Sequence, residues 1–445
     1  MIDYQKYLRF RKMKFQKITI AILLIFSQIA IAQNANETLS SLVKQAIEYS
    51  PRVKEQIQLL NVGDYRIKVQ QSGTKPQING EISYTRLDPI AEAVIPIPGF
   101  EGKLQFQPHN NYNTNIAASY VIYDWGRFKA GVQKTLLEMQ QQREGIESLK
   151  QTLAYQVAQL YYGIIYLQKA IVVQQDQVKL VDENSKIISD RLKSGDALDY
   201  DVVQAQVRYK NAEIRVVDLQ GQLEKQYIFL SALIGSDAHK QIPANAELQY
   251  NYPFADVQGA IGEAAVNNLD IKTALARESA LAQEVKISSM SSLPQLAANG
   301  AIGIKNGYQP DIDAWRFNTL LGVKLSIPIY TGKRGAYNTQ IARINLDAAR
   351  QSTEAQKTLI SRDIENAFND IRVATQKKTL AERNVYQAEY GLKLAKIRLT
   401  NGVSTPLEIQ TSETALEDAK FSLLQYDYQI LLAKLEVSRL SGVKL

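Results

Sequence analysis

The sequence predicts an α+β membrane protein built as a tandem repeat, in which membrane-type strands alternate with very long helices. Three observations carry this prediction. Residues 42–235 and 260–442 present the same features in the same order, as two diverged copies of one unit do. Each copy holds two segments in which apolar and polar residues alternate with period two. Each copy also holds a proline-free heptad pattern, over 127–192 and 333–399, that is far too long for a compact domain.

The repeat is visible as matching segments at a nearly constant separation. These pairs are 46–53 with 264–271, 76–77 with 294–295, 124–127 with 331–334, 191–195 with 398–402, and 233–235 with 440–442. The separation falls from 218 to about 207 residues, which places roughly a dozen extra residues between the two strands of the first copy. We therefore predict a first repeat over 33–235, an inter-repeat equatorial segment over 236–258 and a second repeat over 259–445.

Residues 1–32 have the layout of a secretory signal peptide. Basic residues between positions 9 and 17 precede an apolar run over 18–26, which is too short to span a bilayer. Small residues suited to cleavage follow at 30–32. Either Met1 or Met13 is the start of this segment, and the alternative interpretation is a retained N-terminal anchor.

Charge and cysteine content exclude several classes of function. The formal charge is +7, but residues 1–32 contribute a net +5 of it, and no Lys/Arg cluster with interleaved aromatic residues follows. Nucleic acid is therefore not predicted as a partner. The absence of cysteine excludes thiol catalysis and cysteine metal sites, and it leaves packing or assembly to stabilise a secreted chain.

Four membrane-type strands are predicted, over 76–87 and 112–123 in the first repeat and over 294–305 and 315–330 in the second. Aromatic residues lie near the ends of these strands, as in outer-membrane barrels. Open sheet edges are prohibitive in lipid, so four strands cannot form a barrel alone and several chains must contribute to one. The extra residues of the first copy, over 89–110, are rich in proline and glycine and predict an irregular loop.

The last strand alternates most regularly and therefore predicts which residues face lipid. The lipid-facing residues are expected to be Phe317, Leu321, Val323, Leu325 and Ile327. The pore-facing residues are expected to be Asn318, Lys324 and Ser326.

The long helices are predicted to pack as coiled coils. In the first, eleven of fourteen seam positions are apolar, and the exceptions are Lys150, Gln174 and Ser185. The seam of the second is predicted at Ile341, Ile344, Leu359, Ile364, Phe368 and Ile371. The remaining faces are polar, and they are either solvated surfaces or the lining of a water-filled tube.

Each long helix is predicted to end at a glycine and to return as an antiparallel helix. Gly195 and Gly402 suit a left-handed C-cap. Asp199 or Asp201 starts the first return helix, and Thr405-Pro406 starts the second. At the opposite ends, the expected strand-to-helix turns contain Gly126, Arg127, Pro328, Gly332 and Arg334, where glycine and proline direct the backbone.

Together these features resemble the outer membrane efflux protein family, the TolC-like channels. The resemblance rests on the tandem repeat, on the turn over 329–334 and on the hairpin tip from Gly402 through Glu408 to Ala419. It implies a homotrimer whose chains each give four strands to one twelve-stranded barrel, with a coiled-coil helical barrel in the periplasm. It also implies the outer membrane of a Gram-negative cell, contact with outer-membrane lipid, a periplasmic adaptor and an inner-membrane transporter as partners, and efflux or one-step protein secretion as the function.

The resemblance also implies a site at the periplasmic tip. The residues expected at the aperture, where they would set selectivity, are Glu408, Thr411, Asp201 and Gln204. The residues expected at the tip turns and at adaptor docking are Gly195, Gly402, Leu399 and Ser404. Family channels carry acidic rings at this tip, and the positions that match them are Glu408 and Thr411, of which only Glu408 is acidic. Neither Leu399 nor Ser404 can supply the aromatic hydroxyl or the cation that closes family channels.

No enzyme site is predicted, and neither a cofactor nor a metal is expected. His109 and His239 lie in separate loops, and no acidic cluster has the spacing of metal ligands. Two non-conducting alternatives remain at this point: a periplasmic coiled-coil adaptor and an assembly scaffold without a pore.

Overall fold

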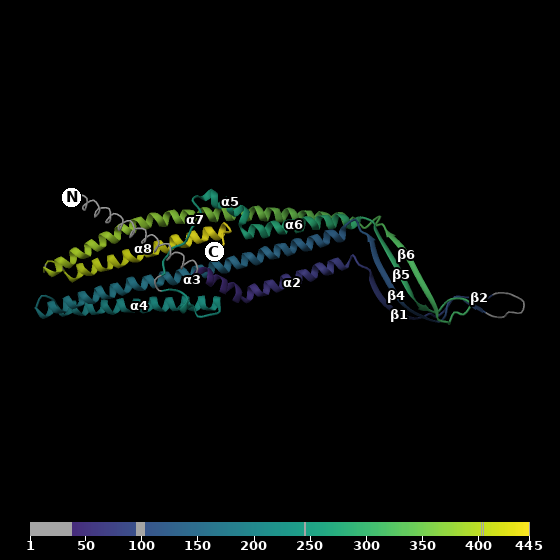
Figure 1. Cartoon of the computed structure of the whole chain (residues 1–445), viewed down its shortest axis with the longest axis horizontal. Helices are drawn as coiled ribbons and strands as arrows, with labels where there is room; N and C mark the ends of the chain where they lie inside the picture. The colour runs from purple at the N-terminus through teal and green to yellow at the C-terminus, as the bar shows by residue number, and fades with distance from the viewer. Residues whose placement is uncertain (1–37, 95–102, 244–245, 402, 404, 445) are drawn as a thin grey trace, which may run out of the picture. The chain divides into compact units, whose positions relative to one another are not determined.

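In the computed structural model of the chain, the described residues are 38–94, 103–243, 246–401, 403 and 405–444 (Figure 1). The predicted signal peptide and two predicted tip residues, Gly402 and Ser404, lie outside the described residues. The chain divides into two compact units. Among the described residues, a helical unit is drawn from those up to 57, from 144–272 and from 355 onward, and a sheet unit from residues 58–143 and 273–354.

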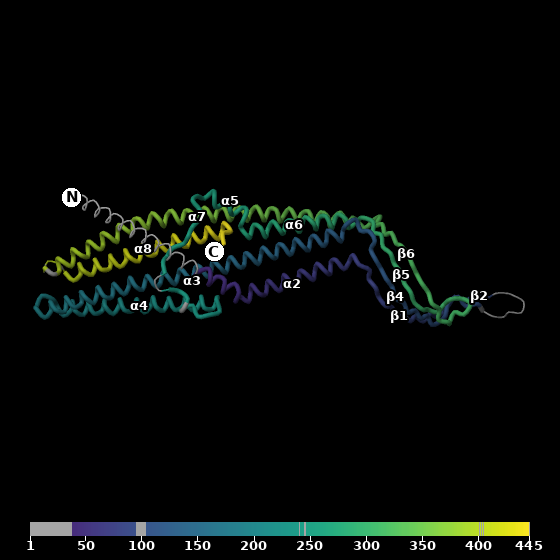
Figure 2. The backbone as a smooth tube through the Cα atoms, viewed as in Figure 1, coloured from purple at the N-terminus to yellow at the C-terminus, as the bar shows by residue number. Residues whose placement is uncertain are grey.

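The sheet unit contains one antiparallel four-stranded sheet with the strand order β1-β4-β5-β6 (Figures 1 and 2). The strands are β1 Gln77–Arg86, β4 Asn110–Tyr123, β5 Gln295–Lys305 and β6 Arg316–Ser326. Four such strands per chain confirm the fold prediction. β1 and β6 are the edge strands, and within the described residues neither pairs with a further strand on its outer side.

The strand register brings the apolar residues of all four strands to one face, because directly paired residues of an antiparallel sheet share a face. One row across the sheet consists of Ile82, Thr114, Ile304 and Phe317. We call this side the apolar face. It is exposed in the single chain, and Leu321 is 91% accessible.

The last strand is shorter than predicted. β6 ends at Ser326, whereas the alternating pattern continues to residue 330. Pro328 has no backbone N–H to give to the ladder, and Ile329 and Tyr330 beyond it are highly exposed. The alternation of side chains therefore continues beyond the end of the hydrogen-bonded strand.

The loop over 89–110 is not wholly irregular, so that expectation was partly wrong. Strands β2 Glu92–Val94 and β3 Lys103–Gln105 form a short antiparallel ladder. The Gln105 side chain donates a hydrogen bond to the Glu92 carboxylate at 3.2 Å. Three residues are too few to show a period-two pattern, which is why the ladder was missed.

Both strand-to-helix turns use two successive residues with positive φ. They are Trp125 and Gly126 before α3, and Gly332 and Lys333 before α7. Glycine thus occupies the second position in one copy and the first in the other. At the first turn, the Asp124 carboxylate accepts hydrogen bonds from the N–H groups of Gly126 at 2.9 Å and Phe128 at 2.6 Å, which caps the helix.

Two long helices have most of their residues in the helical unit, and each pairs with a shorter return helix (Figure 1). They are α3 Arg127–Lys193 with α4 Asp199–Ile234, and α7 Arg334–Thr400 with α8 Pro406–Leu440. α3 and α7 have 67 residues each, which corresponds to about 100 Å of helix. The predicted bounds of α3 and α7 differ from these by one residue at most.

The seam of α3 is buried as predicted. Ile146, Leu153, Leu167, Val181 and Ile188 recur at heptad positions and are all buried. They belong to a row that also includes the polar exception at position 174, which is buried as well. The largest core cluster lies midway along α3 and includes the adjacent, fully buried Tyr161 and Tyr162, which the heptad pattern did not single out.

The predicted seam of α7 was wrong for three of its six residues, whereas Ile364 is fully buried and Phe368 and Ile371 pack against a buried cluster as predicted. Ile341, Ile344 and Leu359 are exposed, whereas the buried row consists mostly of alanines. Its members are Ala342, Ala349, Ile360, Ala367, Ala374, Ala381 and Ala395. Only one large aliphatic residue, Ile360, belongs to this row, so the size of the side chains misled the assignment for residues 341, 344 and 359.

The shorter helices are α2 Pro51–Ser72, α5 Val257–Asn267 and α6 Leu269–Ser289, and residues 38–49 are also helical. The start of α2 and the start of α6 are capped alike. The Ser50 hydroxyl accepts a hydrogen bond from Val53 N–H at 3.3 Å, and the Asn268 amide oxygen accepts one from Ile271 N–H at 3.0 Å. Ser50 and Asn268 are 218 residues apart, which is the separation between equivalent positions of the two repeats.

The ends of the return helices repeat as well. α4 is followed by Gly235 and α8 by Gly442 two residues on, both with positive φ. A Cβ at Gly235 would overlap the ring of Tyr49, and one at Gly442 would overlap the backbone of Asn267. The two glycines and their neighbours, Tyr49 and Asn267, occupy equivalent positions in the two repeats. The repeats therefore share this packing contact as well as their order of elements.

Candidate functional site

The turn between α3 and α4 forms the tip of the first helical hairpin. Gly195 has φ +84°, its N–H donates to Leu192 O at 3.0 Å, and Asp196 N–H donates to Arg191 O at 2.8 Å. This is a Schellman C-cap, which requires the left-handed conformation that glycine adopts without strain. Gly195 therefore has the backbone role predicted for it.

Asp201 and Gln204 lie in the first turns of α4 and make contacts within that helix. The Asp201 carboxylate accepts a hydrogen bond from Leu198 N–H at 3.1 Å, which caps the helix. Gln204 donates to the Tyr200 hydroxyl at 3.1 Å. Both residues thus have local structural roles, and Tyr200 presents an exposed ring beside them.

Glu408 and Thr411 lie at the start of α8, in the second hairpin. Thr405 caps this helix, since its hydroxyl accepts from Glu408 N–H at 3.3 Å. The Glu408 carboxylate lies 3.1 Å from the Arg398 guanidinium of α7, so it forms an ion pair across the hairpin. The Thr411 hydroxyl donates to Leu407 O at 2.9 Å.

Leu399 lies inside the second hairpin rather than on its surface. It is 2% exposed and packs with Ala395 of α7 and Ile409 of α8 in a small apolar cluster. Its side chain therefore holds the two helices of the hairpin together and is not available for adaptor docking. The corresponding turn residues, Gly402 and Ser404, lie outside the described residues.

A buried polar cluster joins the two hairpins, and sequence reasoning missed it. The Asn184 amide of α3 donates a hydrogen bond to the Glu413 carboxylate of α8, and both residues are only 3% exposed. On the next turn of α8, Glu417 is also buried and forms an ion pair of 2.6 Å with Arg215 of α4. These contacts connect residues about 200 positions apart in the sequence.

Burial raises the pKa of the Glu413 carboxyl to about 7. The neighbouring cations Arg208 and Lys396 oppose this increase, and the Glu417 carboxylate adds to it. Burial also lowers the pKa of Arg208. The cations therefore do not fully offset the cost of burying the Glu413 carboxylate, and protonation of Glu413 is favourable in this low-dielectric site.

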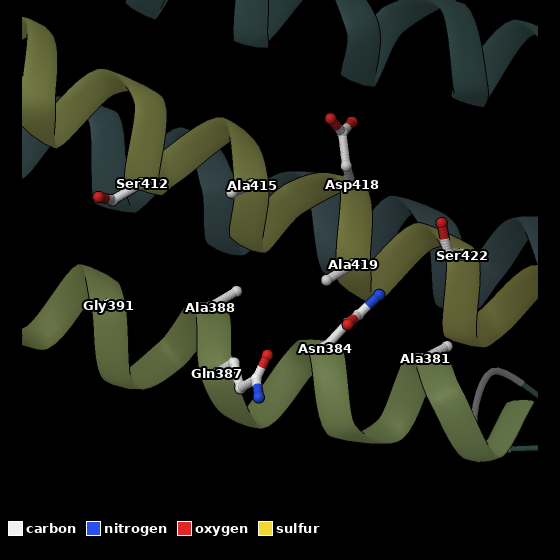
Figure 3. A pocket seen from close by; sticks show the side chains of 10 residues that line it. All are labelled: Ala381, Asn384, Gln387, Ala388, Gly391, Ser412, Ala415, Asp418, Ala419 and Ser422. Atoms are coloured by element: carbon white, nitrogen blue, oxygen red, sulfur yellow. The ribbon is translucent and has the colours of Figure 1, made fainter.

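A groove of about 500 Å³ lies between α7 and α8, several helical turns from the second tip (Figure 3). Most of its walls are small side chains, among them Ala381, Ala388 and Ala415. Asn384 points toward α8, whereas the carboxylate of Asp418 points away from α7. The groove exists because the alanine row of α7 leaves space that larger side chains would fill.

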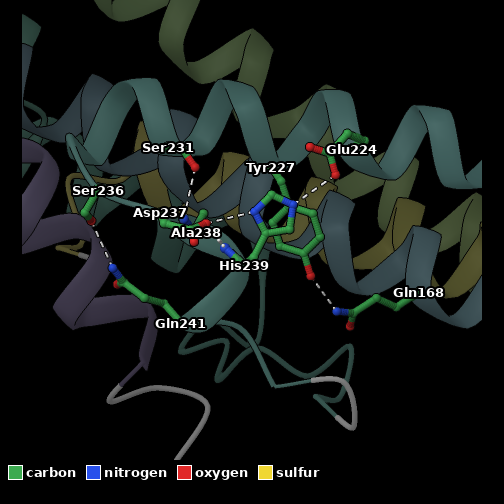
Figure 4. A network of polar contacts seen from close by, with 9 residues as sticks. All are labelled: Gln168, Glu224, Tyr227, Ser231, Ser236, Asp237, Ala238, His239 and Gln241. Atoms are coloured by element: carbon green, nitrogen blue, oxygen red, sulfur yellow. Dashed lines mark hydrogen bonds and ion pairs between the residues drawn. The ribbon is translucent and has the colours of Figure 1, made fainter.

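The segment after α4 is attached through a histidine held between two carboxylates (Figure 4). His239 Nε2 lies 2.9 Å from the Glu224 carboxylate and Nδ1 lies 2.8 Å from that of Asp237. The ring also stacks on Tyr227 at 4.2 Å, and Tyr227 in turn accepts a hydrogen bond from Gln168. Hydrogen bonds to Glu224 and Asp237 raise the pKa of His239, so protonation strengthens this attachment.

The sheet separates apolar from polar side chains, with aromatic residues at both ends. Tyr112 lies 5.1 Å from Tyr84 and 5.4 Å from Trp315 at the loop end, and Tyr123 lies 5.1 Å from Trp125 at the helix end. Opposite the apolar face, a polar face carries rows such as Glu81, Asn115, Gly303 and Asn318. The exposed Leu320 is an apolar exception on that polar face.

No group of three or more His, Asp or Glu side chains among the described residues is placed to hold a metal ion. None of the helices in the described ranges is long and apolar enough to cross a membrane.

Comparison with known proteins places the chain among channel proteins of one family. A family profile described as "Outer membrane efflux protein" matches residues 42–236 and 260–443, that is, both repeats. Outer membrane protein TolC of Escherichia coli is 20% identical over 441 residues, which cover 94% of this chain and 84% of TolC. Outer membrane efflux protein BepC of Brucella suis is 19% identical, with 96% and 90% covered.

Solved structures show the same fold. The outer-membrane channel OprN superposes with a TM-score of 0.77 at 17% identity, covering 93% of this chain and 92% of OprN. VceC of Vibrio cholerae superposes with a TM-score of 0.75 at 18% identity, covering 91% of this chain and 96% of VceC.

Proposed function

The chain belongs to the outer membrane efflux protein family, and on this premise we propose that three copies assemble into one outer-membrane channel. Each chain contributes β1, β4, β5 and β6 to a twelve-stranded barrel, and the helical hairpins form a coiled-coil tunnel in the periplasm. The channel conducts solutes passively, as the outer duct of a tripartite efflux pump or of a one-step secretion system.

The main support for this assembly is that the sheet of a single chain exposes both an apolar face and two edge strands. Its apolar face is exposed, with Ile82, Phe317 and Leu321 all highly accessible, and both of its edge strands are free of further pairing within the described residues. Contact with lipid would bury the apolar face. Pairing of β6 of one chain with β1 of the next would provide hydrogen-bond partners for both edge strands.

The partners proposed for this duct are a periplasmic adaptor and an inner-membrane transporter. A passive channel has no energy source of its own, so directed export requires a transporter coupled to it. The adaptor is expected to meet the hairpin tips, where Leu198, Tyr200 and Leu407 are exposed apolar residues.

We also propose that Glu408 forms a ring of three carboxylates at the periplasmic aperture. It stands on the first turn of α8 and is partly exposed, which suits a lining position. The Arg398 ion pair partly balances its charge, so the ring attracts cations more weakly than three unpaired carboxylates would. The competing interpretation is that Glu408 serves only the hairpin, through Arg398 and the helix N-terminus.

Single-channel recording of Glu408→Gln separates these interpretations. A ring at the aperture predicts lower cation selectivity and weaker block by multivalent cations, with trimer stability nearly unchanged. Arg398→Gln is the matched control, since it should increase cation selectivity by exposing the same carboxylate. Unchanged selectivity in Glu408→Gln, with reduced stability, would leave Glu408 a structural residue.

The assembly itself is tested on the purified full chain in detergent and in planar bilayers. Cross-linking should give a trimer that dissociates on boiling, and reconstitution should give discrete conductance steps. A stable monomer that folds without detergent would refute the proposal. The earlier alternatives, an adaptor or a scaffold without a pore, predict a folded chain with no conductance.

A further inference from the structure

The polar face of the sheet carries an excess of positive charge. Alternation along the strands and the strand register place four charged residues on this face: Glu81, Lys305, Arg316 and Lys324. Three cations and one anion give a net charge of +2 for each chain. The apolar face, in contrast, has one charged residue in these strands, Arg86, at the last position of β1.

Two of the cations are direct cross-strand neighbours. Lys305 of β5 is paired with Arg316 of β6 in the register. Like charges directly opposite each other destabilise a sheet, and residues that break a local rule in this way are often functional. Among the described residues, no ion pair joins Lys305, Arg316 or Lys324 to a carboxylate. The Lys305 ammonium lies over the Tyr308 ring, 4.9 Å from the ring centroid.

A simpler explanation is that these cations lie near the membrane surface and contact lipid phosphates. The register argues against it, because Lys305 and Arg316 share a face with Asn113 and Ser83, not with the apolar residues. Arg86 is the cation at the same end of the sheet whose position is on the apolar face, and its guanidinium is already bound to Asp88 at 3.0 Å.

We propose that the barrel lumen selects for anionic solutes, and that the Lys305–Arg316 pair is the main determinant of this preference. The inference rests on the proposed trimer, in which the polar faces of three sheets line one lumen. The lumen then carries nine cationic and three anionic side chains. The cargo class it favours is a solute or polypeptide segment that bears carboxylate or phosphate groups.

The dimensions of the barrel make the effect measurable. Twelve strands about 4.8 Å apart and tilted by about 40° enclose a backbone radius of about 12 Å. The Debye length is about 10 Å at 0.1 M salt, about 30 Å at 0.01 M and about 3 Å at 1 M. Wall charges therefore act across the whole lumen at low salt and only close to the wall at high salt.

The test is the reversal potential of the full-length channel in planar bilayers across a potassium chloride gradient. It is measured in the Glu408→Gln background, so that the aperture does not mask the barrel. We expect this channel to prefer chloride, and Lys305→Gln with Arg316→Gln to lower the chloride-to-potassium permeability ratio about twofold or more at 0.1 M. The change should disappear near 1 M.

Two single variants serve as matched controls. Glu81→Gln removes the anion of the same face and should raise the chloride preference, the opposite direction. Arg86→Gln removes a cation from the same end of the sheet but from the other face, and it should leave the preference unchanged. Heat-dissociable trimers on gels establish that each variant has assembled.

The outcomes separate this inference from the proposed function. A conducting trimer whose selectivity is unaffected by the double variant, or is affected equally by Arg86→Gln, would overturn the inference alone. A chain that assembles without any conductance would refute the channel and the inference together. Opposite shifts in the double variant and Glu81→Gln, both abolished by high salt, would support the proposal.

Discussion

Replacing Glu413 by glutamine tests how the two helical hairpins are held together. Glu413 is 3% exposed, accepts a hydrogen bond from Asn184, and interacts with Arg208 of α4, Lys396 of α7 and Glu417 of its own helix. Glutamine has nearly the same shape and keeps an oxygen that can accept the Asn184 bond. The substitution therefore removes the charge with little change in packing.

The size of the effect follows from the pKa. A pKa of about 7 in the folded chain, against an ordinary value of 4.5, means that ionisation of Glu413 destabilises the fold by about 3 kcal/mol. Because folding raises the pKa, the protonated form of Glu413 is the form that favours folding. The stability gained from this protonated form is fully present below about pH 4.5 and is lost as pH rises through 7. Glu413→Gln should lack this pH dependence and be more stable than wild type at pH 8.

Thermal unfolding of the purified protein, followed by its helical circular dichroism, measures this difference. Wild type should lose more thermal stability between pH 5 and pH 8 than Glu413→Gln does. Glu389→Gln is the matched control, because Glu389 lies on α7 with its side chain 52% exposed beside Lys420. The reasoning would be wrong if Glu413→Gln melted at or below the wild-type temperature at pH 8 and kept the same pH dependence.

Further predictions concern the sheet, the equatorial segment and a helix end. Arginine at Val323, on the apolar face, should cost about 2–4 kcal/mol and arginine at Ser326 much less; equal losses of trimer stability would refute the face assignment. The raised pKa of His239 predicts an attachment that weakens as pH rises through that pKa, so the hydrogen-exchange protection factor near Ala238, which is corrected for base catalysis, should fall at alkaline pH in wild type but not in His239→Gln. Gly235→Ala should destabilise the chain, because φ is +71° and the new Cβ overlaps Tyr49; an unchanged melting temperature would contradict this.

Much of the fold could be predicted because period and repeat are properties of the sequence itself. The four strands, the bounds of α3 and α7 and the separation of lipid-type from polar residues on β6 all came from periodicity. The end of β6 was not predicted, because Pro328 interrupts hydrogen bonding without interrupting the alternation of side chains. Half of the α7 seam was missed because alanine packs at close helix contacts, where larger residues do not fit, whereas Ile364, Phe368 and Ile371 were assigned correctly.

The candidate site was less predictable because its residues meet across long sequence separations. Nothing local to Asn184 or Glu413 indicates that they meet between hairpins, since each looks like a solvated residue of a polar helix face. Leu399 illustrates the same limit, because a position expected on the surface proves to be a core position of the hairpin. Glu408 was correctly placed near the tip, but its partner Arg398 follows only from the geometry of the turn.

Each chain presents two different sheet edges, β1 on one side and β6 on the other. In an antiparallel sheet of four strands these edges run in opposite directions, so β6 of one chain and β1 of the next continue the same antiparallel pattern. In the proposed trimer, a mutant chain with a damaged β6 edge still has an intact β1 edge, so it can join a ring and prevent the ring from closing. With equal expression of mutant and normal alleles, only about one ring in eight would consist of normal chains alone. Mutations of this kind should therefore be genetically dominant.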